Sequence, residues 1–338
     1  MRQALITGGL GFIGSRIAHN LLGSCTVDHV VLVDDFGSSV SPIEEGASDP
    51  RRQRLIGIED RCTVERARVQ HFSVLADILP RYQPDYIFHL AGMSLASLQN
   101  SSAEEAADGS VLSTNNLLTA CDLLAKRSGY RPQRFVYVSS SMVYGDFLYE
   151  PADEEHPLKP LNIYGTMKLA GEVCTLGLAR AFGIDATVVR LSAVYGPTDM
   201  NRRVVQVFIE RAVRGDALLV QGADVALDFT YVDDAAAGCT LAATRREAAG
   251  EIFNITAGQA HTLIACAELL KAHFPGLTYQ VTEPEGLRPK RGALSIEKAK
   301  SLLGYHPAYS LQRGLDRYVA HIRGFSAATP LRSRSAQA

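Results

Sequence analysis

Tyr164 and Lys168 are a pair of residues whose types and spacing suggest chemistry. They stand four apart in a segment whose apolar pattern predicts a helix over residues 161–182, so both project from nearly the same face. An ammonium beside a phenol favours the phenolate, which lowers the phenol pKa from about 10 toward the range of a general base. The same spacing is common on solvated helix faces, so the pair needs support from its neighbours.

A serine-rich turn upstream supplies that support. The apolar run 135–138 predicts a strand, and Ser-Ser-Ser-Met-Val-Tyr-Gly follows it from Ser139 to Gly145. Open α/β sheets bind ligands at the carboxyl ends of their strands, so a hydroxyl here can share a substrate oxygen with Tyr164. An ordinary turn would explain the serines but not the Tyr–Lys pair that accompanies them.

A glycine-rich turn near the amino terminus predicts a phosphate-binding site. Thr-Gly-Gly-Leu-Gly-Phe-Ile-Gly runs from Thr7 to Gly14, between a predicted strand (4–7) and a predicted helix (11–22). Gly8 permits a tight turn, Gly11 lets backbone N–H groups approach a diphosphate, and Gly14 allows close helix–strand packing. In this context we favour dinucleotide binding over an ordinary strand-to-helix turn.

Two acidic residues indicate which dinucleotide binds. Asp34 and Asp35 end the second predicted strand, and Asp34 follows Gly14 by 20 residues, where a carboxylate can accept both hydroxyls of an adenosine ribose. A 2′-phosphate would be repelled there, and no Arg or Lys occurs from Phe36 to Val40. The sequence therefore predicts NAD as the cofactor, with Asp34 the stronger candidate because Asp35 could be a simple loop residue.

The elements that must position these residues alternate between strand and helix through the first 190 residues. This pattern predicts an α/β fold with a Rossmann-type doubly wound parallel sheet. Strands are expected near 4–7, 30–33, 69–72, 86–90, 135–139 and 187–191, and helices near 11–22, 75–82, 103–126 and 161–182. The polar segment 37–62 is expected to be a surface excursion.

Beyond Pro197 the alternation loosens, which predicts a smaller mixed α/β substrate domain. Helices are expected near 204–214 and 262–274, and a last one ends near Gly324. We expect residues 1–190, rejoined by about 228–256, to form the NAD-binding domain. Residues 191–227 and 257–325 would form the substrate domain, and 326–338 a flexible tail.

Composition excludes several classes of function. The net charge of −2 makes nucleic acid an improbable partner, and the longest uncharged stretch contains too many polar residues to cross a bilayer. Six scattered cysteines without a CxxC pair indicate reduced thiols, and no signal-like segment is visible, so we expect a cytoplasmic protein. No spacing of His, Cys and carboxylates suggests a metal.

Taken together, the motifs resemble the extended short-chain dehydrogenase/reductase family, in the NAD-dependent sugar epimerase/dehydratase branch. They are TGGLGFIG from Thr7, HLAG from His89, SSSMVYG from Ser139, YGTMK from Tyr164, RLSAVYGP from Arg190, DFTYVDDAAAG from Asp228 and KAKSLLGY from Lys298. The resemblance implies that Ser140, Tyr164 and Lys168 are catalytic. It places cofactor contacts on Gly8, Gly11, Phe12, Ile13, Gly14, Asp34, Asp35, Phe36, Ser73, Val74, Leu90, Ala91, Gly92, Tyr164 and Lys168.

Five positions depart from the family pattern. Ser73 stands where the resemblance implies an adenine-contacting aspartate, and Ser141 and Met142 stand where 4,6-dehydratases carry an Asp-Glu pair. Ala193 and Leu227 replace an Asn and a phosphate-binding Arg of the substrate site. The Ser-Met pair disfavours dehydration, and the absence of a glutamate at Met142 also disfavours decarboxylation.

Other arginines could take over phosphate binding, because guanidinium forks suit phosphate and carboxylate. Solubilising surface charge is an equally good explanation for them. The expected substrate contacts are Met93, Ser94, Ser141, Met142, Ala193, Arg202, Arg203, Arg288 and Arg291. His89 is interpreted as a structural strand-end histidine, and Asp228, Asp233 and Asp234 as residues that cap and position the following helix.

The resemblance implies an NAD-dependent epimerase of a nucleotide sugar, most plausibly at C4 through a keto intermediate. A sugar dehydrogenase or ketoreductase, a dehydratase, and a catalytically silent NAD-sensing regulator are the alternatives. By analogy with related enzymes, a homodimer is expected through the helices near 103–126 and 161–182.

Overall fold

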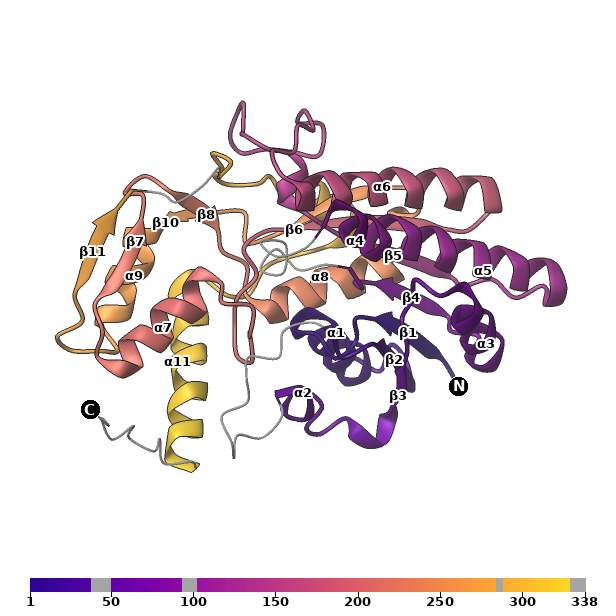
Figure 1. The fold of residues 1–338 in the computed structure, drawn as a ribbon, viewed down its shortest axis with the longest axis horizontal. Coiled ribbons are helices and arrows are strands. Elements are labelled where there is room, and N and C mark those ends of the chain that lie inside the picture. Colours follow the sequence, from indigo (N-terminus) through magenta and orange to yellow (C-terminus); the bar gives the residue numbers. More distant parts are fainter. Residues whose placement is uncertain (38–49, 93–101, 284–287, 329–338) are drawn as a thin grey trace.

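Seven parallel strands form a central sheet in the order β3-β2-β1-β4-β5-β6-β9 (Figure 1). The computed structural model describes residues 1–37, 50–92, 102–283 and 288–328. The strands are β1 (Gln3–Thr7), β2 (His29–Asp34), β3 (Cys62–Arg66), β4 (Tyr86–His89), β5 (Arg134–Ser140), β6 (Ala186–Leu191) and β9 (Ile252–Ile255). The order reverses between β1 and β4, so their carboxyl ends flank the crevice where such sheets bind ligands.

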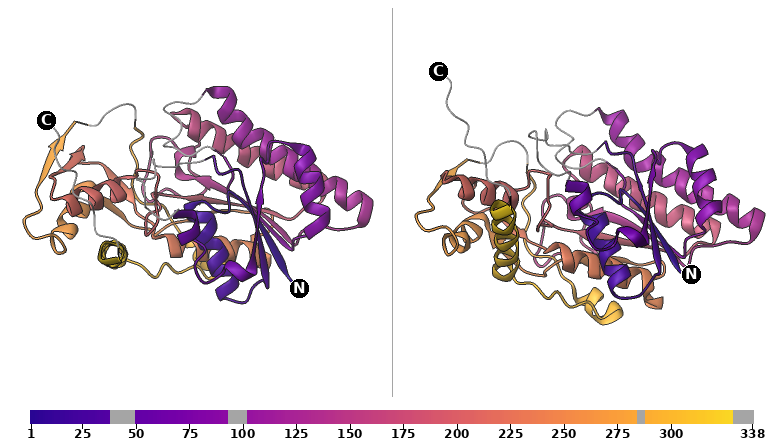
Figure 2. Two further views of the ribbon diagram at one scale, coloured as in Figure 1. Left: turned by 60° about the horizontal axis from the view of Figure 1, so that its bottom comes forward. Right: turned by 90° about the horizontal axis from the view of Figure 1, so that it is seen from below.

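Helices cover both faces of this sheet (Figure 2), which is why its strands β4, β5 and β6 are buried along their whole length and are mostly apolar. One face carries α1 (Phe12–Gly23), α8 (Val232–Thr244) and α10 (Glu297–Leu303), and the other carries α3 (Phe72–Tyr82), α5 (Ser113–Ser128) and α6 (Ile163–Phe182). Successive side chains of β1 alternate between the faces, so Ile6 packs with α1 and Leu5 with α3 and α5. The predicted doubly wound α/β sheet is confirmed.

A smaller group of mixed elements follows β6. Parallel β7 (Leu218–Gln221) and β11 (Tyr279–Thr282) form one pair, and antiparallel β8 (Ala226–Asp228) and β10 (Ala260–Thr262) form another. Helices α7 (Val204–Arg214), α9 (Leu263–Lys271) and α11 (Leu311–Ala328) pack around a third apolar cluster that includes Phe208, Leu270 and Leu315. The helix α11 continues to Ala328, so the first residues of the tail expected from 326 are helical.

Short helices complete the described chain. They are α2 (Pro50–Gln53), η1 (Glu59–Arg61), α4 (Ala103–Ala107), the π-helical turn η3 (Asp108–Leu112), η4 (Ser141–Val143) and η5 (Arg246–Ala248). Within the described ranges no helix is long and apolar enough to span a bilayer. All six cysteines are free thiols.

One predicted strand is wrong. The strand expected at 69–72 is absent, and Phe72 instead begins α3, while β3 lies earlier at Cys62–Arg66. As an edge strand, β3 pairs with β2 and no other described strand, and none of its residues is buried. It contains Thr63, Glu65 and Arg66, so it lacks the apolar run that marks the central strands. The helix expected at 103–126 is also divided, because the turn η3 interrupts it between α4 and α5.

The described part of the polar segment 37–62 is more than a surface excursion. Arg54 is buried, and its guanidinium donates to the carbonyl oxygens of Leu10 at 2.8 Å and Thr198 at 2.6 Å. It therefore joins the glycine-rich turn to the chain that leaves β6. Most of residues 51–61 are exposed or partly exposed, as expected for a surface excursion, but their polarity alone did not reveal the buried cation. Residues 38–49 lie outside the described part of the chain.

We predict opposite effects on stability for two glycines of α6. A Cβ on Gly171 would lie 2.0 Å from Tyr137 Oη, whereas a Cβ on Gly177 would meet nothing within 4 Å. Gly171→Ala should lower the free energy of unfolding by about 1–3 kcal/mol through overpacking. Gly177→Ala should raise it by up to about 1 kcal/mol through helix propensity. Urea unfolding measures both, and a similar effect of the two substitutions would show that α6 is not seated on β5 as described.

Candidate active site

The turn between β1 and α1 has the backbone geometry of a diphosphate cradle. Gly8 has a positive φ of 67°, and its N–H donates to Val33 O at 2.8 Å. A Cβ on Gly14 would lie 2.5 Å from Gly8 O, so helix and turn approach more closely than any side chain would allow. Gly11 is the N-cap of α1 and no side chain caps that end, which leaves its N–H groups and positive dipole to an anion.

Asp34 lies at the end of β2 beside this turn. Its Oδ2 accepts from Leu10 N at 3.1 Å and its Oδ1 from Phe36 N at 2.9 Å. Burial raises the pKa of Asp34, and the two backbone N–H donors act in the opposite direction. Each oxygen keeps a further lone pair for a ribose hydroxyl, so the residue fits the predicted role.

Several arginines that the sequence did not indicate lie beside the ribose end of this cradle. Arg68 lies 3.6 Å from Asp35 Oδ2, and the guanidiniums of Arg51 and Arg66 lie 5.0 and 5.3 Å from the centre of the Phe36 ring. Residues 36–40 carry no cation, but β3 and α2 bring these arginines in from elsewhere in the chain. A search for basic residues at the end of the third strand, and not only after the second, would have found Arg66 and Arg68.

The end of β4 forms the opposite wall of the cradle. Leu90 N donates to Thr7 O at 3.2 Å and Ala91 N to Thr7 Oγ1 at 3.1 Å, and Gly92 has a φ of 154°. Ala91 N would lie 3.1 Å from a Cβ on Gly8, so the two turns are in direct contact. The expected contacts Met93 and Ser94 lie outside the described residues.

Two further expected cofactor contacts lie in α3. Ser73 and Val74 are in the first turn of that helix, and Ser73 is exposed. Residues 67–72 separate Ser73 from the end of β3, which lies earlier in the sequence than the predicted strand. The structure therefore does not place Ser73 directly after the third strand, the position that the resemblance implied for it.

Ser140, Tyr164 and Lys168 are brought together at the carboxyl end of β5. Asn162 caps α6 by accepting from Gly165 N at 2.9 Å, and a Cβ on Gly165 would lie 2.5 Å from Met142 O. This close approach sets the start of α6 against the turn η4. Ser140 lies at the junction of β5 and η4, and its Oγ accepts from Met142 N at 3.2 Å.

The pKa of Tyr164 differs from the expectation. Burial raises it, whereas the charge of Arg203, a hydrogen bond with Ser140 and the charge of Arg291 act in the opposite direction. The expected lowering is therefore wrong for the chain alone, because desolvation of the phenolate outweighs the cations around it. The charges that favour the phenolate are those of Arg203 and Arg291. Both arginines are distant from Tyr164 in the sequence, so the motif around Tyr164 did not predict their effect on its pKa.

Lys168 lies one helical turn beyond Tyr164 and is only 6% exposed. Its Nζ donates to Val138 O at 2.8 Å and lies 5.3 Å and 6.0 Å from the ring centres of Tyr137 and Tyr164. Burial lowers the pKa of Lys168 to about 8, and the Glu172 carboxylate acts in the opposite direction. The structure thus holds an ammonium in a desolvated position beside the phenol.

A buried ion pair lies next to Lys168 on the same helix. Glu172 accepts two hydrogen bonds from Arg190, at 3.0 and 2.8 Å, and a third from Ser139 Oγ at 2.5 Å. Arg190 also donates to Tyr144 Oη at 3.0 Å. Glu172 was not among the expected site residues, although its spacing of four from Lys168 places both side chains on one helix face.

His89 has the surroundings of a structural residue. Its Nδ1 lies 2.7 Å from Thr7 Oγ1, and its Nε2 lies 3.1 and 3.3 Å from the hydroxyls of Thr114 and Ser113. Burial lowers the pKa of His89 to about 3, and the charge of Lys168 acts in the same direction. The imidazole is therefore neutral and joins β1, β4 and α5.

The four candidate arginines separate into two groups. Arg291 Nη1 lies 3.5 Å from Ser141 Oγ, and its Nε is buried without a hydrogen-bond partner in the described part of the protein. Arg203 donates to Val194 O at 3.0 Å and lies 5.8 Å from the centre of the Phe12 ring at the start of α1. Both cations act on the pKa of Tyr164, whereas Arg202 and Arg288 are exposed.

Burial lowers the pKa of Arg291 to about 10, and the charge of Arg288 acts in the same direction. A buried cation with an unused donor is a binding group for an anionic ligand.

Ala193 lies in the turn after β6 with a φ of 36°, and Met142 is buried in η4. Arg288 itself donates to Gln221 in β7, away from this group.

The aspartates near α8 accept hydrogen bonds from distant parts of the chain. Asp228 accepts from the backbone N–H groups of Ala257, Gly258 and Leu294 and from the Thr256 hydroxyl, and burial raises its pKa to about 7. Asp234 accepts from the backbone N–H groups of Ala308 and Tyr309. Neither caps the helix as predicted. No group of residues able to hold a metal ion occurs in the described ranges.

Comparisons with known proteins agree with the fold described above and with NAD as the cofactor. Residues 4–256 match the model of the NAD dependent epimerase/dehydratase family. A Bacillus subtilis protein named as an uncharacterized UDP-glucose epimerase is 28% identical over 95% of this chain and 98% of its own length. A dTDP-glucose 4,6-dehydratase from Actinoplanes is also 28% identical, over 95% of this chain and 98% of its own.

A solved structure shows the same fold. It is the UDP-glucuronic acid 4-epimerase from Bacillus cereus in complex with UDP-glucuronic acid and NAD, with a TM-score of 0.84 and 25% identity over 96% of this chain and 99% of that one. The predicted resemblance and the predicted cofactor are confirmed. The chain therefore belongs to the NAD dependent epimerase/dehydratase family, whose members act on sugar nucleotides with NAD as cofactor.

Proposed function

We propose that this protein is an epimerase that inverts C4 of a nucleotide-activated sugar through a transient keto-sugar. The observation that carries the proposal is the composition of the site. Ser140, Tyr164 and Lys168 converge next to the cofactor cradle, and the residues that follow Ser140 are Ser141 and Met142. Elimination of water needs a further acid and base beside the reacting carbons, and neither a hydroxyl nor a thioether supplies them at neutral pH.

In this proposal Tyr164 exchanges the proton of the C4 hydroxyl. Its phenolate accepts that proton as the alcohol becomes a ketone and returns it when the alcohol is restored. Ser140 donates a hydrogen bond to the reacting oxygen, and the charges of Arg203 and Arg291 favour the phenolate against the effect of burial. The Lys168 ammonium lies 6.0 Å from the centre of the Tyr164 ring. The turn from Gly8 to Gly14 and the Asp34 carboxylate would hold NAD, which would supply a reversible hydride acceptor for the sugar carbon.

Inversion requires that the keto-sugar present its second face without leaving the protein. We assign the grip on the diphosphate to Arg203 and Arg291, which lie on the Tyr164 side of the site. Arg203 and Arg291 would replace the substrate-binding Asn and Arg of the family pattern, whose positions are occupied here by Ala193 and Leu227. Guanidinium forks hold phosphate oxygens in two directions at once. A sugar anchored through its diphosphate rather than its ring would be free to turn.

The test is to incubate purified protein with UDP-, dTDP-, GDP- and CDP-linked hexoses. The expected result for at least one of them is inversion at C4, seen by NMR, without net accumulation of NADH. Tyr164→Phe should lower the rate at least about a hundredfold because the proton acceptor is removed. Tyr149→Phe is a matched control, because Tyr149 is exposed and its hydroxyl bonds Asp153 outside the site.

Other products would contradict the proposal in distinct ways. Stoichiometric NADH with a stable keto-sugar would show a dehydrogenase, and loss of water from the sugar would show a dehydratase. Biological activity that survives Tyr164→Phe would indicate a regulator that only senses NAD.

We further propose a homodimer formed through α5 and α6. These helices pack against each other and lie side by side in Figure 1. Their outer surfaces carry Leu123 and Val173, which are 43% and 66% exposed, and Leu112 of the adjoining turn η3 is 41% exposed. Apolar side chains on two adjacent helices can bury one another across a two-fold axis in a four-helix contact.

The protein is therefore expected to sediment as a dimer at micromolar concentration. Val173→Glu should raise the dissociation constant at least about tenfold, because it places a charge in an apolar contact. Leu148→Glu is the control, since Leu148 is 65% exposed but belongs to neither helix. A monomeric mass for the unmodified protein, or no difference between the two variants, would rule out this interface.

A further inference from the structure

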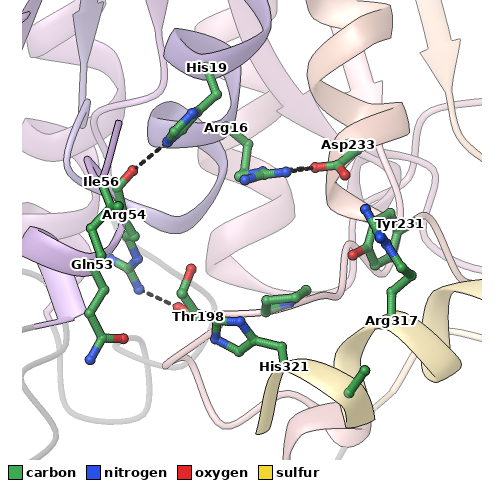
Figure 3. Close-up of a pocket in the computed structure, with 12 residues that line it drawn as sticks. Arg16, His19, Gln53, Arg54, Ile56, Thr198, Tyr231, Asp233, Arg317 and His321 are labelled. Carbon is green, nitrogen blue, oxygen red and sulfur yellow. Dashed lines mark hydrogen bonds and ion pairs between the residues drawn. The ribbon is translucent and has the colours of Figure 1, made fainter. Parts of the chain in front are cut away.

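A pocket lies beside α1, and Tyr164 is not among the residues that line it (Figure 3). It has a volume of about 390 Å³, which is within the range of small-molecule sites. Its walls come from α1, the segment after α2, the turn that follows β6, the start of α8, and α11. The lining residues are Arg16, His19, Gln53, Arg54, Ile56, Pro197, Thr198, Tyr231, Asp233, Arg317, Ala320 and His321.

The charge of this pocket is strongly one-sided. Three arginines line it, Arg16 from α1, Arg54 from the segment after α2 and Arg317 from α11, whereas Asp233 is the single carboxylate among the described lining residues. Arg16 Nε donates to Asp233 Oδ1 at 2.8 Å, so that carboxylate is already engaged by one of the three cations. The pocket thus carries an excess of about two positive charges.

The two histidines add donors and acceptors rather than further charge. Burial lowers the pKa of both His19 and His321, and the charge of Arg16 acts in the same direction on each. His19 Nε2 lies 2.9 Å from Arg54 O. Both rings are therefore neutral near pH 7, and the excess positive charge resides on the guanidinium groups.

Arg16 of α1 and Arg317 of α11 both act on one lining residue of the pocket, Tyr231. Burial raises the pKa of Tyr231 to about 12 and Asp233 acts in the same direction, whereas the charges of Arg16 and Arg317 both oppose this. Figure 3 shows Arg16, Arg317 and Tyr231 around one opening. Arg317 is exposed and forms no hydrogen bond or ion pair with the described residues, so its guanidinium is available to a ligand.

We propose that this pocket binds the phosphate group of a small metabolite, at a site separate from the cofactor and the nucleotide sugar. A phosphate dianion matches the excess charge, and guanidinium forks from different elements suit its several oxygens. None of the catalytic, cofactor or substrate residues assigned above lines the pocket. The proposal therefore does not depend on the proposed function.

A ligand bound in this pocket would link α11 to α1 and would also restrain the glycine-rich turn of the cofactor cradle. Arg54 is the residue that links the pocket to the cradle, because it lines the pocket and its guanidinium donates to Leu10 O in the glycine-rich turn and to Thr198 O beyond β6. A ligand held between Arg54 and Arg317 would restrain both the turn and the helix. Protection of α11 against hydrogen exchange would report this restraint.

The test is calorimetric titration with inorganic phosphate of protein saturated with NAD and UDP, which fill the phosphate sites of the catalytic cleft. Micromolar to millimolar binding to one site per chain is expected. Arg317→Gln and Arg16→Gln should each weaken it at least about tenfold. Arg127→Gln is the control, because Arg127 is exposed on α5 and lies outside the pocket.

A second titrant separates the sources of the phosphate. Tighter binding of glucose 1-phosphate than of inorganic phosphate would identify a phosphate ester, and equal binding would identify the free ion; either result supports the site if Arg317→Gln weakens it. Deuterium exchange at 317–321 should slow on binding in the unmodified protein and not in Arg317→Gln. No binding at millimolar phosphate, or equal binding by all variants, would overturn the proposal.

Discussion

The central constraint on this fold is the burial of one ammonium group at the carboxyl end of the sheet. Lys168 is almost inaccessible to water, and its Nζ has Val138 O as its hydrogen-bond acceptor and the rings of Tyr137 and Tyr164 as its neighbours. Desolvation disfavours the charged form, so the position destabilises the folded protein unless the surroundings compensate. Glu172, one turn further along α6, supplies the opposing charge and is itself fixed by Arg190.

The approach of α6 to β5 and η4 depends on residues without side chains. Gly165 lets the helix start against Met142 O, and Gly171 lets it pass Tyr137. A neutral His89 then fills the space between β4, β1 and α5, which avoids a second cation near Lys168. The site is consequently set by the sheet and one helix rather than by loops, the arrangement that holds reacting groups most rigidly.

The sequence predicted those parts of the site whose geometry is local. The turn from Thr7 to Gly14, the acidic end of β2 and the Tyr164–Lys168 spacing each follow from one strand or one helix, and the structure places them as expected. The edge strand β3 was misplaced because burial on one side only leaves a weak pattern. Arg54, Arg66 and Arg291 were missed or ambiguous because tertiary contacts from distant segments decide their roles.

The measurement that tests this account most directly is the unfolding free energy of Lys168→Met without cofactor, followed from pH 7 to pH 10. A lysine pKa lowered to about 8 from 10.5 means that the unfolded chain binds more protons between these values, so the unmodified protein gains stability as pH rises. At pH 7 the substitution should leave stability unchanged or raise it by up to about 3 kcal/mol, with a smaller difference at pH 10 and no catalysis. A large loss of stability at pH 7, or retained activity, would contradict the claim that the buried ammonium serves chemistry rather than folding.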